Sequence, residues 1–444
     1  MIEMKDSGIE WIGEIPRHWK VGRTKNCYTN HKDVVGDEAD NYERLALTLG
    51  GVIKRSKVDA TGLQPEAFEG YQILRENELV FKLIDLENVA TSRVGYSPYT
   101  GIVSPAYIVL TPRESDESRF GEYFFLSMWQ REVFNHMGDD GVRSSLNSKD
   151  LLNIPYLIVP SGEKAKIVAF LDKQCAEIDS VIEQTKATIE EYKKLKQSVI
   201  TEAVTKGIRG DRPMKDSGIE WIGEIPAEWN LIQIKHLKSK DKNAFVDGPF
   251  GSNLKSIHFV ENGDVYVVES GFITTGKFVF KKFKTITSSH FETIKRSECK
   301  ANDVIIAKIG ANFGMAAELP KLDKPSVVSG NSLKITLDQA KILNSIFVYE
   351  LGIAKNRGGY VGLYNETAQP ALSLSTLNSF KLVVAPIEEQ KEIANYLYGK
   401  CAEIDTLIAK KTALLDEMET YKKSVIYEYV TGKKEVYKNA KKCN

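Results

Sequence analysis

Two long stretches of the chain repeat apolar residues every seven positions. Residues 163–206 contain neither proline nor glycine, and residues 389–431 contain no proline, which favours two long helices. The first stretch carries the series Leu171, Ile178, Tyr192 and Val199 beside Cys175, Ile182, Ile189 and Ala203. The second carries Leu397, Ile404, Met418 and Val425 beside Cys401, Ile408, Leu415 and Tyr429. Lys196 and Lys422 interrupt the two seams at equivalent places.

Such a seam must be covered by another surface. A helix of 44 residues is about 66 Å long, which is more than a small neighbouring domain can cover. The chain order is domain, helix, domain, helix, so we expect the two helices to form an antiparallel coiled coil with one domain at each end. Cys175 and Cys401 occupy matched seam positions, and we interpret them as core residues instead of redox groups or metal ligands.

The seams belong to a duplication that runs through the whole chain. Residues 4–16, MKDSGIEWIGEIP, return letter for letter at 214–226, and Trp19 matches Trp229 at the same offset of 210. Towards the end of each copy the offset has grown to 226. The second copy has therefore gained about fifteen residues, which we place between its tryptophan and the strand-like segment NDVIIAK at 302–308.

Between the repeated segments, short apolar runs bounded by glycine and proline predict strands. These runs are YQIL (71–74), ELVFKLI (78–84) and IVSPAYIVL (102–110) in the first copy, and VYVV (265–268), DVIIAKI (303–309) and LKITL (333–337) in the second. Amphipathic stretches around 122–129 and 342–351 predict one short helix in each copy. The predicted fold class is α+β, with two tandem α/β domains, two long helices forming an antiparallel coiled coil, and a pseudo-two-fold internal repeat. We place the first domain at 1–161, its helix at 162–208, the second domain at 209–387, and the second helix with a C-terminal tail at 388–444.

Composition narrows the functional classes. The 444 residues carry 60 basic and 60 acidic side chains, which argues against a protein that coats nucleic acid nonspecifically but allows local basic patches. Residues 1–160 have a net charge of −6 and residues 214–387 of +4, so the two copies differ electrostatically. No apolar run approaches the length of a membrane span, and the N-terminal residues do not resemble a secretory signal, so we expect a cytoplasmic protein. The five cysteines are scattered, which favours reduced thiols over disulfides and gives no zinc-ligand spacing.

Catalytic motifs are weak throughout. The segment NIPY (153–156) superficially resembles the N-P-P-Y loop of adenine methyltransferases, but it lies in an apolar run, and the second copy has NSFK there, so we interpret it as the end of a strand. Glu298 and Lys300 fit only the last part of a nuclease-type D…E-x-K site. No G-x-G-x-x-G follows a predicted strand and no Walker A motif is present, so the sequence shows no binding motif for S-adenosylmethionine or ATP. We predict a protein without catalytic residues or a bound metal.

Polar, basic and glycine-rich loop positions are our candidates for contacts with DNA phosphates and base edges. DGPFGSNLK (247–255) is among them because its glycines would allow close approach to a phosphate, although a simple hairpin turn is the alternative interpretation. The candidates in the first copy are Lys54, Arg55, Lys57, Lys82, Arg93, Tyr96 and Arg143. Those in the second copy are Ser252, Asn253, Lys255, Lys308, Asn312, Asn331, Arg357, Tyr364 and Gln369.

Several segments together resemble a known family. They are DSGIEWIGEIP-x-x-W at 6–19 and 216–229, DGPFGS at 247–252, PIEEQKEI at 386–393, and YK-x-SVI-x-E-x-VTG at 421–432. In this order and number they are typical of the specificity (S) subunit of type I restriction–modification systems, the HsdS family, and the resemblance covers nearly the whole chain. The first helix departs slightly, because PSGEKAKI (160–167) replaces the usual P-x-x-E-Q form.

The resemblance implies more than composition does. It implies a non-catalytic DNA-binding subunit of a type I restriction endonuclease and adenine-N6 DNA methyltransferase complex, in which each target recognition domain reads one half of a bipartite, asymmetric site in double-stranded DNA. It further implies that the helices set the half-site spacing and dock two modification (methyltransferase) subunits, with two restriction (motor-nuclease) subunits as possible further partners. S-adenosylmethionine, ATP and Mg would be used by those partner subunits. A scaffold that assembles protein partners through its coiled coil without binding DNA is the alternative, and the zero net charge is its best support.

Overall fold

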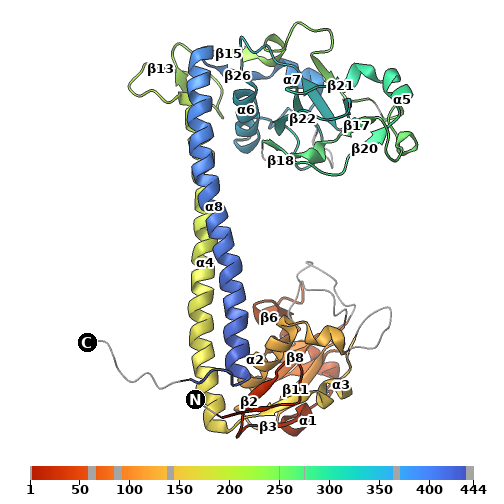
Figure 1. The fold of residues 1–444 in the computed structure, drawn as a ribbon, viewed down its shortest axis with the longest axis vertical. Helices are drawn as coiled ribbons and strands as arrows, with labels where there is room; N and C mark the ends of the chain where they lie inside the picture. Colours follow the sequence, from red (N-terminus) through yellow and green to blue (C-terminus); the bar gives the residue numbers. More distant parts are fainter. Residues whose placement is uncertain are drawn as a thin grey trace. The chain divides into compact units, whose positions relative to one another are not determined.

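The computed structural model describes residues 3–58, 67–84, 93–137, 145–249, 251–274, 276–363 and 371–436. The chain divides into two compact units, Met1–Ala187 with Lys411–Asn444, and Thr188–Lys410. Helices α4 (Ser161–Lys206) and α8 (Ile387–Val430) each contribute one part to each unit (Figure 1). Each compact unit thus combines one α/β domain with parts of both long helices, whereas the domain limits drawn from the sequence follow the order of elements along the chain.

The first unit contains two four-stranded sheets, in the orders β6-β5-β10-β7 and β4-β11-β8-β9, and the pairs β1-β2 and β3-β12. Its strands are β1 (Met4–Asp6), β2 (Glu14–Pro16), β3 (Lys20–Arg23), β4 (Tyr28–Thr29), β5 (Arg44–Thr48), β6 (Gly51–Arg55), β7 (Gln72–Leu74), β8 (Leu79–Phe81), β9 (Val94–Tyr96), β10 (Gly101–Val103), β11 (Ile108–Pro112) and β12 (Pro155–Ile158). Its shorter helices are α1 (Thr24–Cys27), η1 (Gly36–Asn41), α2 (Glu117–Gln130), η2 (Val133–His136) and α3 (Ser148–Asn153).

The second unit repeats this plan, with sheets in the orders β20-β17-β24-β21 and β16-β25-β22-β23 and the pairs β13-β14, β15-β26 and β18-β19. Its strands are β13 (Met214–Asp216), β14 (Glu224–Pro226), β15 (Asn230–Gln233), β16 (Phe245–Asp247), β17 (Val265–Val268), β18 (Ile273–Thr274), β19 (Lys277–Phe278), β20 (Lys284–Ile286), β21 (Glu298–Cys299), β22 (Val304–Ala307), β23 (Ala316–Glu318), β24 (Ser326–Val328), β25 (Ser332–Ile335) and β26 (Lys381–Val384). Its shorter helices are η3 (Ile234–His236), η4 (Ser256–His258), η5 (Ser270–Phe272), α5 (Ser288–Thr293), η6 (Lys295–Ser297), α6 (Asn344–Asn356) and α7 (Leu374–Ser379).

The two units therefore share one strand topology, which includes the single parallel neighbours β5·β10 and β17·β24 among otherwise antiparallel pairs. They differ most in one connection. Two residues, Leu49 and Gly50, join β5 to β6, whereas the fifteen residues 269–283 join β17 to β20 and form η5, β18 and β19. The insertion that the sequence comparison places before residue 302 thus lies mainly in this connection. Five of the six predicted strand segments and both predicted short helices, now α2 and α6, are confirmed. The run 102–110 is divided by residues 104–107 into β10 and β11, which belong to different sheets.

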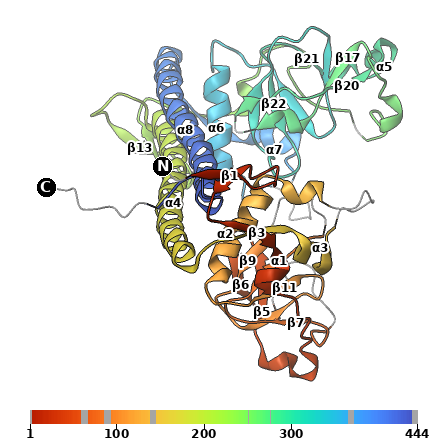
Figure 2. The ribbon, with the colours of Figure 1, turned by 60° about the horizontal axis from the view of Figure 1, so that its bottom comes forward.

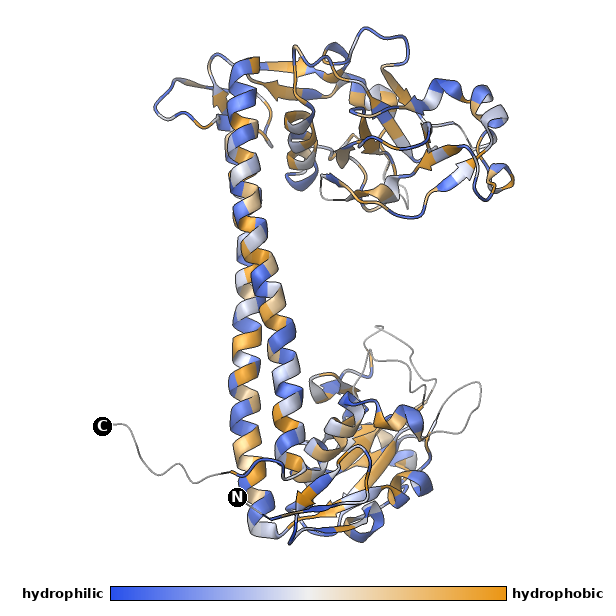
Figure 3. Cartoon of the chain, in the orientation of Figure 1, coloured by the Kyte–Doolittle hydropathy of each residue, from blue (hydrophilic) through white to orange (hydrophobic). Residues whose placement is uncertain are grey.

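Apolar side chains fill the space between the sheets and the helices of each unit. In the first unit, Phe81, Phe124, Phe125 and Tyr156 are fully buried, and Phe125 lies with its ring centroid 5.0 Å from that of Phe81. Tyr156 belongs to β12, so NIPY is a strand end as predicted. Figure 3 shows this pattern, with hydrophobic colour concentrated in the sheets and hydrophilic colour on many of the connections.

Within each unit the parts of α4 and α8 run side by side in opposite directions (Figure 1). In the first unit the rings of Phe170 and Tyr429 are 4.3 Å apart, and Lys422 Nζ lies 2.6 Å from Asp179 Oδ1. In the second unit Lys196 Nζ lies 2.6 Å from Asp405 Oδ1. The two lysines that interrupt the seams therefore pair with aspartates of the opposite helix, which explains how charged side chains are accommodated there.

The seam cysteines are packed as core residues. Cys175 is 6% exposed and Cys401 is 7% exposed, and both side chains are free thiols. Burial raises the pKa of each thiol, which disfavours the thiolate that redox chemistry or metal binding would need. The packing interpretation is confirmed.

The identical segments form two hairpins with identical register, β1-β2 with Met4 opposite Pro16 and β13-β14 with Met214 opposite Pro226. Each hairpin packs on the C-terminal end of the helix from the other copy. The first shares a core with Ile426 and Val430 of α8, and the second with Ala203 and Val204 of α4. Figure 2 shows these hairpins from a second direction.

Candidate DNA interface

The first unit carries a groove on the sheet that contains β5 and β6. The groove has a volume of about 550 Å³ and is lined by residues 44–50 together with Arg55, Tyr71, Lys82, Ser104 and Tyr107. Its position follows from strand pairing, since Arg44 of β5 lies directly opposite Arg55 of β6. Burial raises the pKa of Tyr107 although the charges of Arg44 and Arg55 act against that shift. Three cationic side chains and a tyrosine hydroxyl form a surface suited to phosphate oxygens or the acceptor edge of guanine.

Lys54 and Lys57 line a neighbouring hollow of about 340 Å³, together with Arg55. Lys54 Nζ lies 2.5 Å from Glu43 Oε2, and both side chains are more than half exposed. Such an exposed pair contributes little to stability, so a phosphate can replace the carboxylate at low cost. Lys57 is more firmly held, because its ammonium donates a hydrogen bond to the carbonyl of Ala39 at 2.6 Å and lies 5.6 Å from the ring centroid of Phe68.

In the second unit, charged and polar groups gather where β16 ends. Asp247 Oδ1 accepts a hydrogen bond from Arg296 at 3.1 Å, and Asp247 Oδ2 lies 3.8 Å from Lys308 Nζ. The amide of Lys308 donates to the carbonyl of Asn331 at 2.9 Å, which brings these two predicted contact residues together. The site differs from the groove of the first unit because a 10%-exposed carboxylate lies among its cations.

Close backbone packing fixes this second site. A Cβ atom on Gly248 would lie 1.9 Å from the carbonyl oxygen of Ser329, so only glycine fits there. Gly248 at the start of DGPFGS therefore packs on residues 329–332, and its amide donates to the carbonyl of Ser332 at 3.1 Å. The hairpin interpretation is wrong, because β16 pairs with β25 and the chain continues from the loop into η4.

The loop that follows presents Ser252, Asn253 and Lys255, all exposed as predicted. Two stacked imidazoles hold it. His258 Nδ1 accepts a hydrogen bond from the amide of Lys255 at 3.0 Å, His290 Nε2 lies 2.9 Å from the carbonyl of Asn253, and the ring centroids are 4.0 Å apart. Because side-chain to backbone bonds secure both ends of the segment, its polar groups are presented in a defined arrangement.

Comparison with known proteins agrees with this architecture. A family model described as the type I restriction modification DNA specificity domain matches residues 251–416. Two curated relatives come from Methanocaldococcus jannaschii. The type I restriction enzyme MjaVIII specificity subunit is 24% identical over 81% of this chain and 80% of its own, and the putative type I restriction enzyme MjaX specificity subunit is 23% identical over 95% of each chain. A solved chain from a study of complex assembly and conformational transition of the type I R-M system superimposes with a TM-score of 0.70, at 12% identity, over 94% of this chain and 99% of that one.

The superposition confirms the predicted fold class. The matching family model and both curated relatives describe specificity proteins of type I restriction–modification systems, and this chain is similar to them along most of its length.

Two predicted contact residues of the first unit, Arg93 and Tyr96, are not freely exposed. Arg93 is only 1% exposed, and its guanidinium donates to the carbonyls of Ile84 and Lys82, at 2.9 and 3.3 Å. It therefore holds residues 82–84, which follow β8, and is not placed to contact DNA in this arrangement. Tyr96 is half-buried, and its hydroxyl donates to Asn77 Oδ1 at 2.6 Å while Arg119 lies 5.1 Å from its ring centroid.

Asn312 and Arg357 of the second unit are exposed but less closely grouped. The Asn312 side chain donates to the carbonyl of Ile273 at 3.4 Å, and Arg357 follows the end of α6. Arg143, Tyr364 and Gln369 lie outside the described residues.

Three residues of these surfaces, Arg44, Tyr107 and Arg296, were not predicted from the sequence. Arg44 begins a strand in which alternate residues are buried, so the alternation around RLALT could have placed its side chain on the open face. Arg296 could not have been found in this way, because its relation to Asp247 depends on contacts between segments 49 residues apart.

No group of three or more histidine, cysteine or acidic side chains suited to a metal ion occurs in the part of the chain that the structure describes. Among the described helices, none combines the length and apolarity needed to cross a membrane.

Proposed function

We propose that the chain is the DNA-reading subunit of a type I restriction–modification complex and that each unit reads one half of a bipartite site in double-stranded DNA. The observation that carries this proposal is the contrast between a shared strand topology and unlike polar surfaces. The first unit offers the groove with Arg44, Arg55 and Lys82, whereas the second offers Lys308 and Asn331 around Asp247. Two different surfaces on equivalent frameworks suit a target whose halves differ in sequence.

Partner subunits supply the chemistry under this proposal. Two modification subunits would bind the chain and use S-adenosylmethionine to methylate adenine, and restriction subunits, where present, would use ATP and Mg. The chain itself would bind no cofactor and act in the cytoplasm. The long helices would set the number of base pairs between the half-sites, since each is a continuous element shared by both units.

Methylome sequencing tests the assignment of half-sites. Replacing residues 20–145 with the same module of another specificity subunit should change one half-site and leave the other half-site and the spacing unchanged. Inserting about one helical turn in both α4 and α8 should change only the spacing. A methylome in which the module exchange alters both half-sites would contradict the proposal.

Point variants sharpen this test. Arg55→Ala and Lys82→Ala should each weaken binding of the assembled complex to its site by about tenfold, the range expected for loss of one base or phosphate contact. Lys149→Ala is the control, because Lys149 is an exposed cation on α3, and the groove does not include it.

Salt dependence separates DNA reading from the scaffold alternative. Binding to the specific duplex should fall steeply as salt rises, because phosphate contacts release counterions. A complex that retains its modification subunits but shows no salt-sensitive preference for any duplex would favour the scaffold.

A further inference from the structure

Two histidines of the second unit stack on each other beside the exposed segment 252–257. His258 lies in η4 and His290 in α5, with their ring centroids 4.0 Å apart and their planes inclined by 21°. Both side chains are half-buried. Phe291, the next residue of α5, is buried in the core of this unit. The stack therefore joins the exposed segment to an element that is anchored in the core.

Burial alone gives the segment little support. Leu254 packs on the core, but Ile257 is 82% exposed. The side chains of Ser252, Asn253 and Lys255 also lie open to solvent. A stretch with few buried apolar contacts keeps one shape only when polar contacts hold its backbone. The bonds from the two histidines to the backbone of this segment are such contacts.

These two hydrogen bonds place different demands on the two rings. The amide of Lys255 donates to His258 Nδ1 at 3.0 Å, so this nitrogen must be without a proton. His290 Nε2 lies 2.9 Å from the carbonyl oxygen of Asn253, which only accepts, so this nitrogen must carry a proton. A second proton on His258 would occupy Nδ1 and remove the acceptor, whereas a protonated His290 would still donate. Of the two rings, only His258 has to remain neutral to hold the segment.

The surroundings of His258 favour its neutral form. Burial, followed by repulsion from His290 and from Lys255, lowers the pKa of His258 below its ordinary value of about 6.5. A histidine whose folded-state pKa is lowered contributes stability that is fully present above the unfolded value. That contribution is lost as the pH falls from about 6.5 through the folded-state pKa. The arrangement of the segment should therefore weaken in mild acid.

Other charged side chains on and around α5 are paired with neighbours and not with the stacked rings. They are Asp264, which accepts the hydroxyl of Ser288 at 3.0 Å, Glu292 with Lys295 at 2.7 Å, and Lys284 of β20 with Glu269 at 2.8 Å. The charges that act on His258 within the described residues are thus the two positive ones, and they oppose a proton at Nδ1.

We propose that His258 and His290 are positioning residues for DNA reading, which hold residues 252–255 in the arrangement that meets the half-site of the second unit, and that they do so only while His258 is neutral. This inference rests on the proposed function, in which the exposed polar side chains of this segment contact DNA. Recognition of that half-site should weaken as the pH falls below about 6.5. Histidines that contacted phosphates directly would produce the reverse, because their positive charge would strengthen binding in acid.

The experiment measures binding between pH 7.5 and pH 5.5. It uses the chain assembled with its modification subunits and a duplex that carries its site. Competitor duplexes altered in one half-site at a time show which half-site is affected, and the half-site of the second unit is the one that an exchange of residues 20–145 leaves unchanged. Discrimination by the parent complex should fall about tenfold at this half-site between pH 7.5 and pH 5.5, the loss expected when one contact is misplaced.

Three variants separate the acceptor from the charge. His258→Ala removes the acceptor and should lower discrimination at this half-site about tenfold already at pH 7.5. His258→Asn offers an amide oxygen in place of Nδ1 and does not titrate, so it should match the parent at pH 7.5 and keep that affinity at pH 5.5. His290→Gln retains an N–H donor for the carbonyl of Asn253 and should also match the parent at pH 7.5. His236→Asn, at an exposed histidine on η3 of the same unit, is the control and should leave the pH dependence unchanged.

Retained discrimination at the other half-site shows that each variant has folded and assembled. Binding by the parent that strengthens as the pH falls would overturn the proposal in favour of direct phosphate contact. The same pH dependence in the parent and in His258→Asn would also overturn it, as would a His258→Asn complex that binds as weakly as His258→Ala at pH 7.5. In each of these cases a salt-sensitive preference of the parent for its duplex leaves the proposed function intact. A parent complex that prefers no duplex would overturn both.

Discussion

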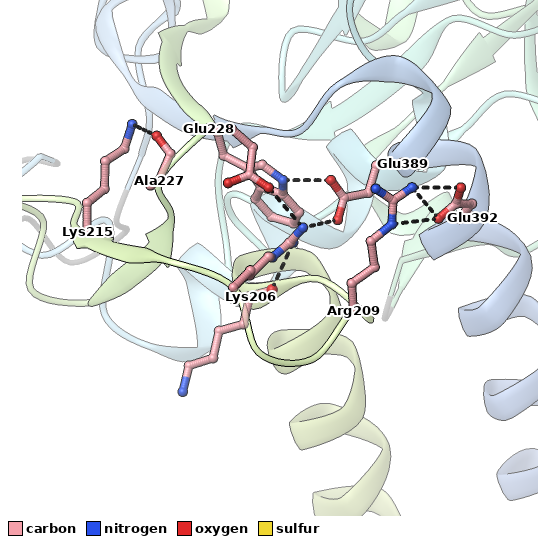
Figure 4. A network of polar contacts seen from close by, with 9 residues as sticks. Lys206, Arg209, Lys215, Ala227, Glu228, Glu389 and Glu392 are labelled. Atoms are coloured by element: carbon pink, nitrogen blue, oxygen red, sulfur yellow. Dashed lines mark hydrogen bonds and ion pairs between the residues drawn. The ribbon is translucent and has the colours of Figure 1, made fainter.

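The two junctions between a hairpin segment and the start of a long helix use the same tryptophan and glutamate, but the glutamate meets an arginine in one unit and a histidine in the other. In the second unit, Glu389 accepts the indole N–H of Trp229 at 2.9 Å and pairs with Arg212 at 2.6 Å (Figure 4). Arg212 also lies 5.0 Å from the ring centroid of Trp229. In the first unit, Glu163 accepts the indole N–H of Trp19 at 2.8 Å and lies 2.7 Å from His18 Nε2. Both junctions therefore keep the hydrogen bond between tryptophan and glutamate, while the side chain that pairs with the glutamate differs.

The two junctions also differ in how deeply the glutamate and its partner are buried, and this affects their contribution to stability. The side chains of Arg212 and Glu389 are 11% and 3% exposed, whereas those of His18 and Glu163 are 46% and 37% exposed. A buried guanidinium that loses its carboxylate partner cannot recover that interaction from water. The first junction is open to solvent, and a pocket of about 390 Å³ adjoins Trp19 and Glu163. The contacts of the helix glutamate should thus contribute more to the stability of the second unit than to that of the first.

Removing the glutamates tests this difference most strongly. Glu389→Ala should destabilise the second unit by about 2–4 kcal/mol, because Arg212 keeps only its half-exposed partner Glu228 and the carbonyl of Lys206, and the Trp229 indole is left unpaired. Glu163→Ala should cost about 1–2 kcal/mol, since water can reach His18 and only the Trp19 indole is buried. Hydrogen exchange of the two units, measured with chemical denaturation, separates the losses. Equal losses would show that burial does not distinguish the junctions.

The shared framework was predictable from sequence, and particular residues show why. The seam from Leu171 to Val199 reveals a helix and its buried side through local spacing alone. Lys196 and Lys422 break that spacing, but their aspartate partners lie about 209 and 243 residues away, and a pattern along the chain does not identify them. Pairing between distant segments is decided by the whole fold.

The candidate contacts were harder to predict for the same reason. Lys54, Arg55 and Lys57 could be selected as a run of cations, and they do lie together, the first two at the end of β6 and Lys57 just after it. Arg93 was indistinguishable from them in sequence, yet it is buried, because two backbone carbonyls replace water around its guanidinium. Whether a charged side chain faces solvent depends on such tertiary hydrogen bonds, and the local sequence does not reveal them.

The short helix of each module offers a second comparison, between two buried glutamates. Glu350 of α6 is fully buried, and neither of its carboxylate oxygens has a hydrogen-bond partner within the described residues. Glu122 of α2 is 8% exposed but accepts the amide of Tyr96 at 3.1 Å and pairs with Arg119. Burial raises the pKa of both carboxyl groups, and far more so for Glu350.

This difference predicts unequal effects of the same substitution. The raised pKa of Glu350 means that its contribution is most favourable below the ordinary glutamate pKa of about 4.3, and stability falls by about 1.4 kcal/mol per pH unit above that value until the folded-state pKa is reached. Glu350→Gln should remove this loss, so the variant is more stable than the parent at pH 7 and gains nothing at pH 4. Glu122→Gln should gain much less at pH 7, because the pair with Arg119 and the amide of Tyr96 offset most of the cost of burying the Glu122 carboxylate. Thermal unfolding at pH 4, 5.5 and 7 measures both, and equal gains for the two variants would contradict the comparison.

The smallest expected difference lies at the seam lysines. Asp405 accepts hydrogen bonds from Lys196 at 2.6 Å and from Lys277 at 3.1 Å, and Lys277 belongs to the inserted strand β19. At the equivalent position of the first unit, Asp179 accepts a hydrogen bond from Lys422. Burial opposes ionisation of Asp405, but hydrogen bonds from the two lysines outweigh it and hold the pKa of Asp405 below its ordinary value. The insertion thus attaches the second module to its helix at a point that the first module does not use.

Asp405→Asn should therefore cost more than Asp179→Asn, by about 1 kcal/mol against a few tenths, the range measured for partly exposed ion pairs. A depressed carboxyl pKa gives stability that is present above the unfolded value of about 3.9 and is lost as the pH falls through the folded-state pKa. The difference between Asp405→Asn and the parent should accordingly disappear near pH 3, and urea unfolding at pH 3 and pH 7 measures it. Lys277→Met, which removes only the contact from the inserted strand, should lower the cost of Asp405→Asn to that of Asp179→Asn. If the cost of Asp405→Asn is the same with and without Lys277, the inserted strand does not stabilise this junction.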